Sequence, residues 1–327
     1  MCTAITFKAD DLYFGRTLDL EYSYNETVTV TPRRFPFSFR NKATLTEHFA
    51  LIGMATVADG YPLYYEATNE KGLSMAGLNF NGYAHYFSVA KGKDNIASFE
   101  FIPWILAQCR DTDEAQQLLK NLNITDTAFS KELQPSPLHW IIADKQNSIT
   151  VESTVDGLKI YDNPIGVLTN NPPFPYHMTH LSTFMHLSPR PSANTFSDKT
   201  ELKSFSRGSG ALGLPGDCTS QSRFVRASFN KLNAATFDTE KENVEQFFHI
   251  LSSVEQIKGT VKTSDGKDVI TVYTSCCNAD KGLYYYTTYH NRSITGVDMK
   301  KSNIESKKLI CYKLNNMNSC SMNNQGT

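Results

Sequence analysis

The chain has 327 residues, of which 40% are hydrophobic, and its 32 Lys and Arg residues nearly balance 33 Asp and Glu residues, giving a formal net charge of −1. This balance, without a basic patch interleaved with aromatic residues, argues against a nucleic-acid partner. No stretch approaches the roughly 20 apolar residues that a membrane span needs, and the first residues lack the charged and apolar regions of a signal peptide. We therefore expect a soluble, cytoplasmic protein without a membrane partner, and with enough apolar residues for one large domain or two ordinary ones.

The first third of the chain predicts antiparallel strands followed by two helices. Short apolar segments are separated by Gly, Asn and Asp turns, and apolar residues then recur at helical spacing. Asp113 stands where the N-cap of the second helix is expected. The predicted strands are residues 3–7, 12–14, 27–30, 49–57, 63–66 and 73–78, and the predicted helices are residues 99–109 and 113–122.

The rest of the chain predicts short hairpin-linked strands, two more helices and closing strands. Runs of strands followed by runs of helices indicate an α+β architecture rather than alternating parallel units. The strands are expected at residues 139–143, 148–152, 158–161 and 166–169, the helices at 220–232 and 244–254, and the closing strands at 268–276, 283–290 and 294–298.

No linker rich in Pro, Gly or Ser divides the chain, and the long irregular segment 189–217 is interpreted as a surface excursion within one domain. Three of its glycines, Gly208, Gly210 and Gly213, match the pattern GxGxxG. A dinucleotide site needs an apolar strand before this pattern and a helix opening inside it, whereas here the preceding residues are not apolar and Pro215 follows closely. We interpret the segment as a flexible or substrate-gating loop.

Seven cysteines, an odd number without a CxxC spacing, fit neither a disulfide framework nor a tetrahedral zinc site, so we expect reduced thiols. Cys276 and Cys277 end an apolar and aromatic run, and neighbours on a strand point to opposite faces, which favours core packing. Redox or metal chemistry at this pair is the alternative, although no partner ligands stand at metal spacing. The other cysteines are Cys2, Cys109, Cys218, Cys311 and Cys320.

Cys2 stands directly behind Met1. Removal of Met1 would make this cysteine the first residue, with a thiol and a free α-amine on one residue. The pKa of an unperturbed thiol is about 8.5 and that of an α-amine about 7.7 to 8.0, so near neutral pH the amine can act as base to the thiol. The alternative is an incidental buried thiol.

Arg16 and Asp19 follow the second predicted strand. If a turn at residues 9–11 joins the first two strands in antiparallel fashion, both residues lie near the new N-terminus. An arginine near the thiol favours the thiolate, and an aspartate near the amine orients it by hydrogen bonding. The alternative is a surface arginine and aspartate in a turn.

Eight motifs extend in order over nearly the whole chain, as far as about Lys313. They are Met1-Cys2-Thr3, FGRTLD (14–19), NEKGL (69–73), AGLNF (76–80), GVLTNNP (166–172), GLPGD (213–217), SRF (222–224) and KGLYYY (281–286). Together they resemble the choloylglycine hydrolase family, cysteine N-terminal nucleophile hydrolases that comprise bile salt hydrolases and penicillin V acylases.

The resemblance implies a fold and an assembly. The expected fold is a four-layer αββα sandwich, with two antiparallel sheets between helix layers, in one domain at residues 1–313 whose mature form begins at Cys2. The polar residues 314–327 are expected to be a disordered tail. The resemblance also implies a homotetramer, and neither a metal nor an organic cofactor.

The resemblance further implies roles for the residues that match its motifs. A fixed amide donor at a developing oxyanion is typically worth about 10² to 10³ in rate, whereas an asparagine by itself is more often a turn residue that bonds its own backbone. The matching residues are Cys2 as nucleophile, Arg16 beside it, Asp19 at its amine, Asn79 and Asn170 for the oxyanion and N-terminal hydrogen bonds, and Arg223 to complete the polar cluster.

The asparagine at position 79, in AGLNF, resembles the bile salt branch of the family at this place, because penicillin V acylases usually carry an aromatic residue there. Bulky apolar residues should line a site for the apolar face of a steroid. Ala58 departs from the large aromatic residue of some relatives, which leaves the pocket shape open, and core packing is the alternative for every pocket residue. The residues that match pocket positions are Leu18, Ala58, Phe129, Leu133 and Leu138.

The expected substrates are bile salts conjugated to glycine or taurine, and the expected reaction is hydrolysis of their amide bond. The Cys2 thiol attacks the carbonyl, the amino acid leaves, and water releases the free bile acid, with the α-amine acting first as base and then as acid. Penicillin V acylase activity on the same machinery is one alternative, since a phenoxyacetyl group also fits an apolar pocket. A catalytically silent protein that binds bile acids is another.

Overall fold

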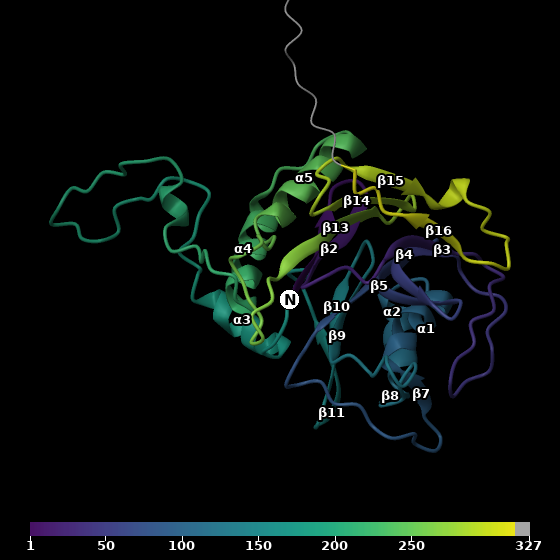
Figure 1. Ribbon diagram of the computed structural model, residues 1–327. Helices are drawn as coiled ribbons and strands as arrows, with labels where there is room; N and C mark the ends of the chain where they lie inside the picture. Colours follow the sequence, from purple (N-terminus) through teal and green to yellow (C-terminus); the bar gives the residue numbers. More distant parts are fainter. Residues whose placement is uncertain (318–327) are drawn as a thin grey trace, which may run out of the picture.

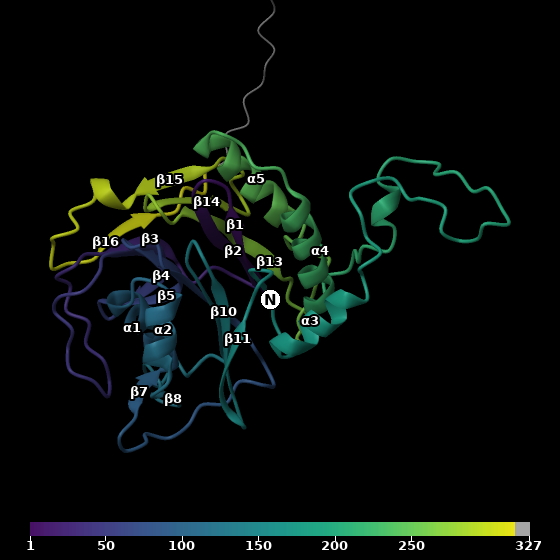
Figure 2. The same ribbon diagram turned by 180° about the vertical axis from the view of Figure 1, so that it is seen from behind.

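Two antiparallel sheets lie face to face, and helices cover their outer sides, so that the chain forms four layers (Figures 1 and 2). The computed structural model describes residues 1–317. The expected α+β class and αββα layering are confirmed. Within residues 1–317, no helix is both long enough and apolar enough to cross a bilayer.

The six-stranded sheet carries the N-terminus. Its strand order is β12-β1-β2-β13-β14-β15, and every neighbouring pair is antiparallel. The first strand of the chain therefore lies between β2, its partner in the first hairpin, and β12, which comes from a distant part of the sequence. The strands are β1 (Cys2–Lys8), β2 (Leu12–Leu20), β12 (Val167–Leu168), β13 (Ile270–Asn278), β14 (Leu283–Thr288) and β15 (Thr295–Asp298).

The eight-stranded sheet has the order β11-β10-β9-β6-β5-β4-β3-β16, again antiparallel throughout. Its strands are β3 (Thr27–Thr31), β4 (Leu51–Ala58), β5 (Tyr61–Asn69), β6 (Ser74–Asn79), β9 (Leu138–Ala143), β10 (Ser148–Thr154), β11 (Gly157–Asp162) and β16 (Ile310–Lys313). A separate parallel pair is formed by β7 (Asp94–Ala97) and β8 (Leu122–Thr125).

The helices form the two outer layers. α1 (Phe101–Gln108) packs on β4, β5 and β6, and α2 (Thr112–Leu119) lies beside it (Figure 1). On the opposite side, α4 (Ser220–Asn233) packs on β1 and β12, and α5 (Glu240–Ser252) packs on β2 and β13. α3 (Phe174–Ser182) packs against α4. Short 3₁₀ turns occur at Ser98–Glu100, Ser209–Ala211 and Met299–Lys301.

β2 is buried on both faces, because one face meets the eight-stranded sheet and the other meets the helix layer. Gly15 allows β13 to approach it closely. A Cβ atom at this position would lie 2.0 Å from the carbonyl oxygen of Ser275, a distance that no side chain tolerates. The glycine of the FGRTLD motif therefore has a packing role one residue before Arg16.

Most predicted elements are confirmed, but the end of the second strand and the start of the second helix were predicted wrongly. β2 continues to Leu20, so Arg16 and Asp19 lie within the strand and do not follow it. Asp111, not Asp113, is the N-cap of α2, and its side chain accepts the N–H of Glu114 at 2.9 Å. Both aspartates precede apolar residues at helical spacing, so composition alone does not distinguish the cap. The predicted end was also too late, because Leu122 already begins β8.

Three kinds of element were missed. α3 buries only Phe174 and His177 and therefore has no clear apolar periodicity. β7 and β8 are only four residues long and pair in parallel, which requires a partner distant in sequence. β16 is an edge strand whose residues are mostly exposed, so it lacks the apolar alternation of a half-buried strand.

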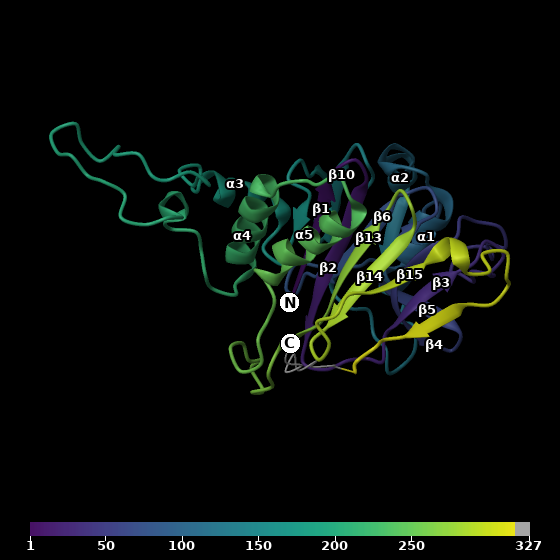
Figure 3. The same cartoon turned by 90° about the horizontal axis from the view of Figure 1, so that it is seen from above.

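The irregular segment 189–217 extends away from the layered body, as Figures 1 and 3 show. Phe196 and Phe205 on this segment are 83% and 88% exposed. Gly208 has a φ of 77° and precedes only a 3₁₀ turn, and neither a strand before it nor an α-helix inside the GxGxxG pattern is present. The pattern therefore lacks the strand and the helix that the dinucleotide fingerprint requires.

The end of the described chain returns to the body. The N–H of Asn315 donates to the hydroxyl of Tyr286 (2.9 Å), and its carbonyl accepts from Asn291 (3.0 Å). The rest of the tail, residues 318–327, lies outside the described residues. The single domain at 1–313 and the disordered tail stay predictions.

Candidate active site

β1 and β2 bring Cys2 and Asp19 together at one end of the six-stranded sheet. Cys2 lies opposite Leu18 in the antiparallel register and is 4% exposed. The N–H of Asp19 donates to the carbonyl oxygen of Met1 (3.0 Å), and the Met1 ammonium donates to the carbonyl oxygen of Asp19 (2.7 Å). The predicted meeting of these strand ends is confirmed, and Figure 3 shows the N-terminus beside β2.

The side chain of Asn170 lies at the centre of this end of the sheet. The residue follows β12, the neighbour of β1. Its Oδ1 accepts the backbone N–H of Cys2 at 2.9 Å and an N–H of Arg223 at 2.6 Å, and its Nδ2 donates to the carbonyl oxygen of Asn79 at 2.8 Å. One carboxamide therefore links the N-terminal strand, α4 and the end of β6.

The carboxylate of Asp19 is fully buried and held by two threonine hydroxyls. Thr271 donates to Oδ1 at 2.7 Å, and Thr17 donates to Oδ2 at 3.2 Å. A β-bulge between Thr271 and Tyr273 shifts the register so that Thr271 lies opposite Asp19. Burial raises the pKa of Asp19, while the charges of the N-terminus and of Arg223 oppose this effect.

Arg16 lies on the opposite face of β2 from Asp19, because successive side chains of a strand alternate. Its Nη1 donates to the carbonyl oxygens of Tyr65 (3.2 Å) and Gly77 in the other sheet, and its Nε lies 3.8 Å from Glu66. Burial opposes the charged form, but the neighbouring Cys2, Tyr273 and Glu66 outweigh it and raise the pKa of Arg16. A buried cation therefore lies between the sheets near Cys2.

Arg223 lies in the first turn of α4 and is fully buried. Its Nη1 donates to the carbonyl oxygen of Cys2 and to Thr3 Oγ1 (2.7 Å), and its Nε donates to the carbonyl oxygen of Cys218 (3.0 Å). Burial lowers the pKa of Arg223, while the charges of Asp19 and Cys2 oppose this effect. The guanidinium therefore holds the carbonyl of Cys2 and the hydroxyl of Thr3.

Asn79 ends β6 and is exposed. Its Oδ1 accepts the N–H of Asn81 at 3.0 Å, which orients the carboxamide, and its Nδ2 makes no hydrogen bond to the described residues. The Nδ2 group is therefore available to donate to an oxygen of a bound molecule.

The residues predicted for the pocket fall into two groups. Leu18 lies opposite Cys2, and Leu138 lies opposite Asn79, in their respective strand registers. The second group is connected through Tyr61 and Phe129. Ala58 pairs with Tyr61, the ring of Phe129 lies 6.1 Å from that ring, and Leu133, 39% exposed, accepts the N–H of Phe129 at 3.1 Å.

A family model described as "Linear amide C-N hydrolases, choloylglycine hydrolase family" matches residues 2–312. The chain belongs to the choloylglycine hydrolase family. The bile salt hydrolase/transferase of Lactiplantibacillus plantarum is 52% identical over 314 residues, which cover 96% of this chain and 97% of that protein. The bile salt hydrolase/transferase of Clostridium perfringens is 39% identical over 322 residues, which cover 96% of this chain and 97% of that protein.

Solved structures agree with this membership. A mutant conjugated bile acid hydrolase from Clostridium perfringens superposes with a TM-score of 0.92 at 37% identity, covering 99% of this chain and 100% of that chain. A penicillin V acylase from Agrobacterium tumefaciens superposes with a TM-score of 0.75 at 19% identity, covering 94% of this chain and 90% of that chain, and it therefore shares the fold. This choloylglycine hydrolase has the fold of N-terminal nucleophile hydrolases.

Two groups at the site of this choloylglycine hydrolase were not predicted. Thr271 contacts Asp19 from a strand some 250 residues later in the chain, and only the β-bulge brings it there. Glu66 accepts hydrogen bonds from the hydroxyls of Tyr273 (2.7 Å) and Tyr284 (2.5 Å) between the sheets. A single acidic residue within the apolar run of β5 was the sequence signal for Glu66.

Cys276 and Cys277 of this choloylglycine hydrolase are both buried in the core, as predicted. Burial raises the pKa of Cys277 to about 12 and that of Cys276 well above its usual value. Because the thiolate is the reactive form of cysteine, burial of both side chains favours core packing over thiol reactivity.

Proposed function

We propose that this enzyme hydrolyses the amide bond of bile salts conjugated to glycine or taurine, through an acyl-enzyme on Cys2. The observation that carries the proposal is the hydrogen bond from the nitrogen of Cys2 to Asn170 Oδ1, at 2.9 Å, within a cluster formed by Asp19 and Arg223. The names of the relatives, bile salt hydrolase/transferase and conjugated bile acid hydrolase, supply the substrate class.

Met1 must be removed before this chemistry can start. In the chain that begins with Met1, the nitrogen of Cys2 belongs to a peptide bond and has no basic lone pair. Removal of Met1 frees an α-amine whose ordinary pKa is about 7.7 to 8.0, next to the thiol. Asn170 Oδ1 and Asp19 lie where they can orient that amine.

The first step forms a thioester. The α-amine takes the proton of the Cys2 thiol, and the sulfur attacks the amide carbonyl carbon. The amine then returns the proton to the nitrogen of the leaving glycine or taurine as the carbon–nitrogen bond breaks. In the second step the amine removes a proton from water, whose oxygen attacks the thioester carbon. The amine then returns that proton to the sulfur of Cys2 as the carbon–sulfur bond breaks, which releases the free bile acid and restores the thiol.

Asn79 is proposed to stabilise the oxyanion. Negative charge develops on the carbonyl oxygen during both steps, and the Nδ2 group of Asn79 has no partner among the described residues. A fixed donor at this position lowers the barrier, typically by a factor of about 10² to 10³ in rate.

Arg16, Asp19 and Arg223 are proposed to act on the nucleophile. The buried cation of Arg16 lies near Cys2 and can stabilise negative charge that develops there during the reaction. Asp19 orients the amine, and Arg223 holds the carbonyl of Cys2 and the carboxamide of Asn170.

The steroid is proposed to lie on an apolar surface. Leu18 and Leu138 lie opposite Cys2 and Asn79 in their strand pairs, Ala58 pairs with Tyr61, the ring of Phe129 lies near that of Tyr61, and Leu133 bonds the backbone of Phe129. Such side chains can cover the apolar face of a steroid while the glycine or taurine end faces polar groups.

Release of taurine from taurocholate tests the proposal. The protein that begins at Cys2 should release taurine, whereas Cys2→Ser, or a protein that retains Met1, should give no more than a trace. Intact mass establishes which N-terminus each sample carries. Undiminished hydrolysis by either form would contradict the Cys2 mechanism.

Penicillin V acylase activity is a second candidate, because the Agrobacterium enzyme shares this fold. Turnover of taurocholate and penicillin V measured side by side separates the two substrates. A silent bile-acid-binding protein would show neither activity, and its Cys2 would not react rapidly with iodoacetamide.

Acyl transfer is a further candidate for the same site, since several relatives are named hydrolase/transferase. The thioester can be attacked by an amine instead of water, with the same proton transfers. Mass spectrometry of a reaction that contains cholyl donor and an added free amino acid would detect the new conjugate.

We also propose a cytoplasmic homotetramer. Phe196 and Phe205 are exposed on the projecting segment 189–217, and a contact between subunits would cover these large apolar side chains. Analytical ultracentrifugation measures the oligomeric state directly.

A further inference from the structure

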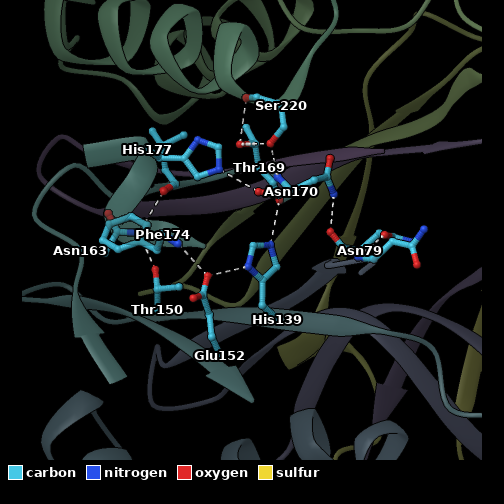
Figure 4. A network of polar contacts seen from close by, with 12 residues as sticks. Asn79, His139, Thr150, Glu152, Asn163, Thr169, Asn170, Phe174, His177 and Ser220 are labelled. Carbon is cyan, nitrogen blue, oxygen red and sulfur yellow. Dashed lines mark hydrogen bonds and ion pairs between the residues drawn. The ribbon is translucent and has the colours of Figure 1, made fainter. Parts of the chain in front are cut away.

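Two buried imidazoles hold consecutive carbonyl oxygens in the segment that carries Asn170. The segment connects β12 to α3, and its residues Thr169 and Asn170 are both buried (Figure 4). His139 Nε2 lies 3.1 Å from the carbonyl oxygen of Thr169, and His177 Nε2 lies 2.8 Å from that of Asn170. A carbonyl oxygen only accepts hydrogen bonds, so each imidazole donates from Nε2.

His139 lies on β9 of the eight-stranded sheet, and hydrogen bonds and ring stacking hold its imidazole. Its Nδ1 lies 3.1 Å from Oε1 of Glu152 on the neighbouring strand β10, and both side chains are fully buried. The ring of Phe80 stacks on the imidazole, with 4.3 Å between centroids and 7° between planes. Glu152 Oε1 also accepts the N–H of Phe174, the first residue of α3, at 2.9 Å.

His177 comes from α3 and is held by a different element. Its ring stacks on Phe224 of α4, with 4.9 Å between centroids. Burial lowers the pKa of His177 to about 4, so the ring is neutral near pH 7 and carries its proton on Nε2, toward Asn170.

Ser220, the first residue of α4, contacts two further polar groups of the segment. Its hydroxyl accepts the N–H of Asn170 at 2.8 Å and lies 3.0 Å from Thr169 Oγ1. The carbonyl of Thr169 and the N–H and carbonyl of Asn170 therefore bond to side chains from β9, α4 and α3. Hydrogen bonds to side chains, and not pairing with a neighbouring strand, therefore hold the backbone at Thr169 and Asn170.

We propose that His139 and His177 are positioning residues, which hold the backbone at 169–170 so that the carboxamide of Asn170 meets the nitrogen of Cys2 and the carbonyl of Asn79. Glu152 orients His139 in this arrangement. The inference rests on the proposed function, because its consequence is measured as turnover at Cys2. A misplacement of about 1 Å at a reacting group can cost about 10²-fold in rate.

A matched pair of substitutions separates this role from simple packing. In His139→Gln, the side-chain nitrogen stands about where Nε2 stood and can still donate to Thr169. In His139→Asn, the nitrogen stands about where Nδ1 stood, so it reaches Glu152 but not Thr169. We expect kcat for taurocholate to fall about 10- to 100-fold in the asparagine variant, with KM within about threefold of the unsubstituted enzyme, and to be largely retained in the glutamine variant.

The same pair at His177 tests the second carbonyl independently. His177→Gln should retain most of kcat, and His177→Asn should lose about 10- to 100-fold. If His139→Asn does not fold, as judged by circular dichroism, the His177 pair decides the matter. Equal losses in the glutamine and asparagine variants, or a change in KM alone, would overturn the inference.

His48 offers a matched control. Its two ring nitrogens also contact backbone carbonyls, those of Phe49 (2.7 Å) and Phe35 (2.8 Å), in a part of the molecule that does not contact Cys2. His48→Asn and His48→Gln should leave kcat unchanged, and a loss there equal to that at His139 would also overturn the inference.

If the proposed bile salt hydrolysis is wrong, a different result is expected. An unsubstituted enzyme that releases no taurine would refute the bile salt proposal by itself. The positioning of Asn170 is then measured by the rate at which iodoacetamide alkylates Cys2. We expect that rate to change in His139→Asn and to stay unchanged in His139→Gln, and equal rates in both variants would overturn the inference.

Discussion

At the scale of single residues, the site is organised by hydrogen bonds to the backbone of Cys2. Asn170 accepts from its nitrogen, and Arg223 donates to its carbonyl oxygen. A charged or polar group buried without a partner costs about 1 to 3 kcal/mol or more, so such a cluster persists only when its members satisfy one another. These hydrogen bonds around Cys2 are already formed in the chain that still carries Met1.

Asn79 is expected to act on the transition state rather than on substrate binding. In Asn79→Ala the free Nδ2 donor is lost, and kcat should fall about 10²- to 10³-fold. Asn81→Ala is the control, since Asn81 contributes its backbone N–H, which the substitution keeps. Steady-state kinetics with taurocholate measure both, and a similar loss in the two variants would argue against an oxyanion role.

At the scale of elements, Asp144 ties the hairpin between β9 and β10 to the start of α2. Its Oδ2 accepts the N–H of Thr112 (2.7 Å), and its Oδ1 accepts the N–H groups of Gln146 (2.7 Å) and Asn147 (2.8 Å). Burial opposes the charged form, but these donors prevail and lower the pKa of Asp144.

Asp144 should therefore stabilise the fold in a pH-dependent way. A carboxyl group whose pKa is lowered on folding contributes stability above its unfolded pKa of about 3.9, and this stability is lost as the pH falls through the folded value. Asp144→Asn should lower the free energy of unfolding by about 1 to 2 kcal/mol at pH 7 and by less at pH 3.5. Urea unfolding measures the difference. Asp113→Asn, at a position outside this set of hydrogen bonds, should change little, and a difference independent of pH would contradict the role of the charge.

At the scale of the whole molecule, Arg16 connects the two sheets. It projects from β2 toward the carbonyl oxygens of Tyr65 and Gly77, and Glu66 lies 3.8 Å from its Nε. Burial raises the pKa of Glu66, and Arg16 opposes that effect. The Arg16 guanidinium, which lies near Cys2, therefore also contributes to the packing of the two sheets.

Removing Arg16 alone should cost more than removing the pair. Arg16→Met leaves the buried carboxylate of Glu66 without its counter-charge and two carbonyls without their donor, and the free energy of unfolding should fall by about 3 kcal/mol or more. Arg16→Met combined with Glu66→Gln should recover part of this loss, because no unpaired charge remains. Urea unfolding of both variants measures the coupling. Arg34→Met, at an exposed ion pair with Glu305, should cost less than about 1 kcal/mol, and additive effects at Arg16 and Glu66 would refute the coupling.

The amino-acid sequence by itself determined the class, the family and several of the residues that meet around Cys2. Motifs such as FGRTLD and GVLTNNP carry Arg16, Asp19 and Asn170, and the geometry of the first hairpin is sufficient to predict Asp19 beside Cys2. This prediction needed only the local sequence, because the two strands of a hairpin pair through residues that lie close together in the chain.

Only the tertiary structure decided which distant groups complete the site. The β-bulge in β13 puts Thr271 opposite Asp19, and β9 and α3 bring His139 and His177 to the backbone of Asn170. These contacts depend on register and on packing between layers, and a histidine in an apolar strand has the same local sequence pattern whether it holds a carbonyl or fills the core. The choice of Asp111 over Asp113 as helix cap has the same origin, since Asp144 holds Thr112 from another element.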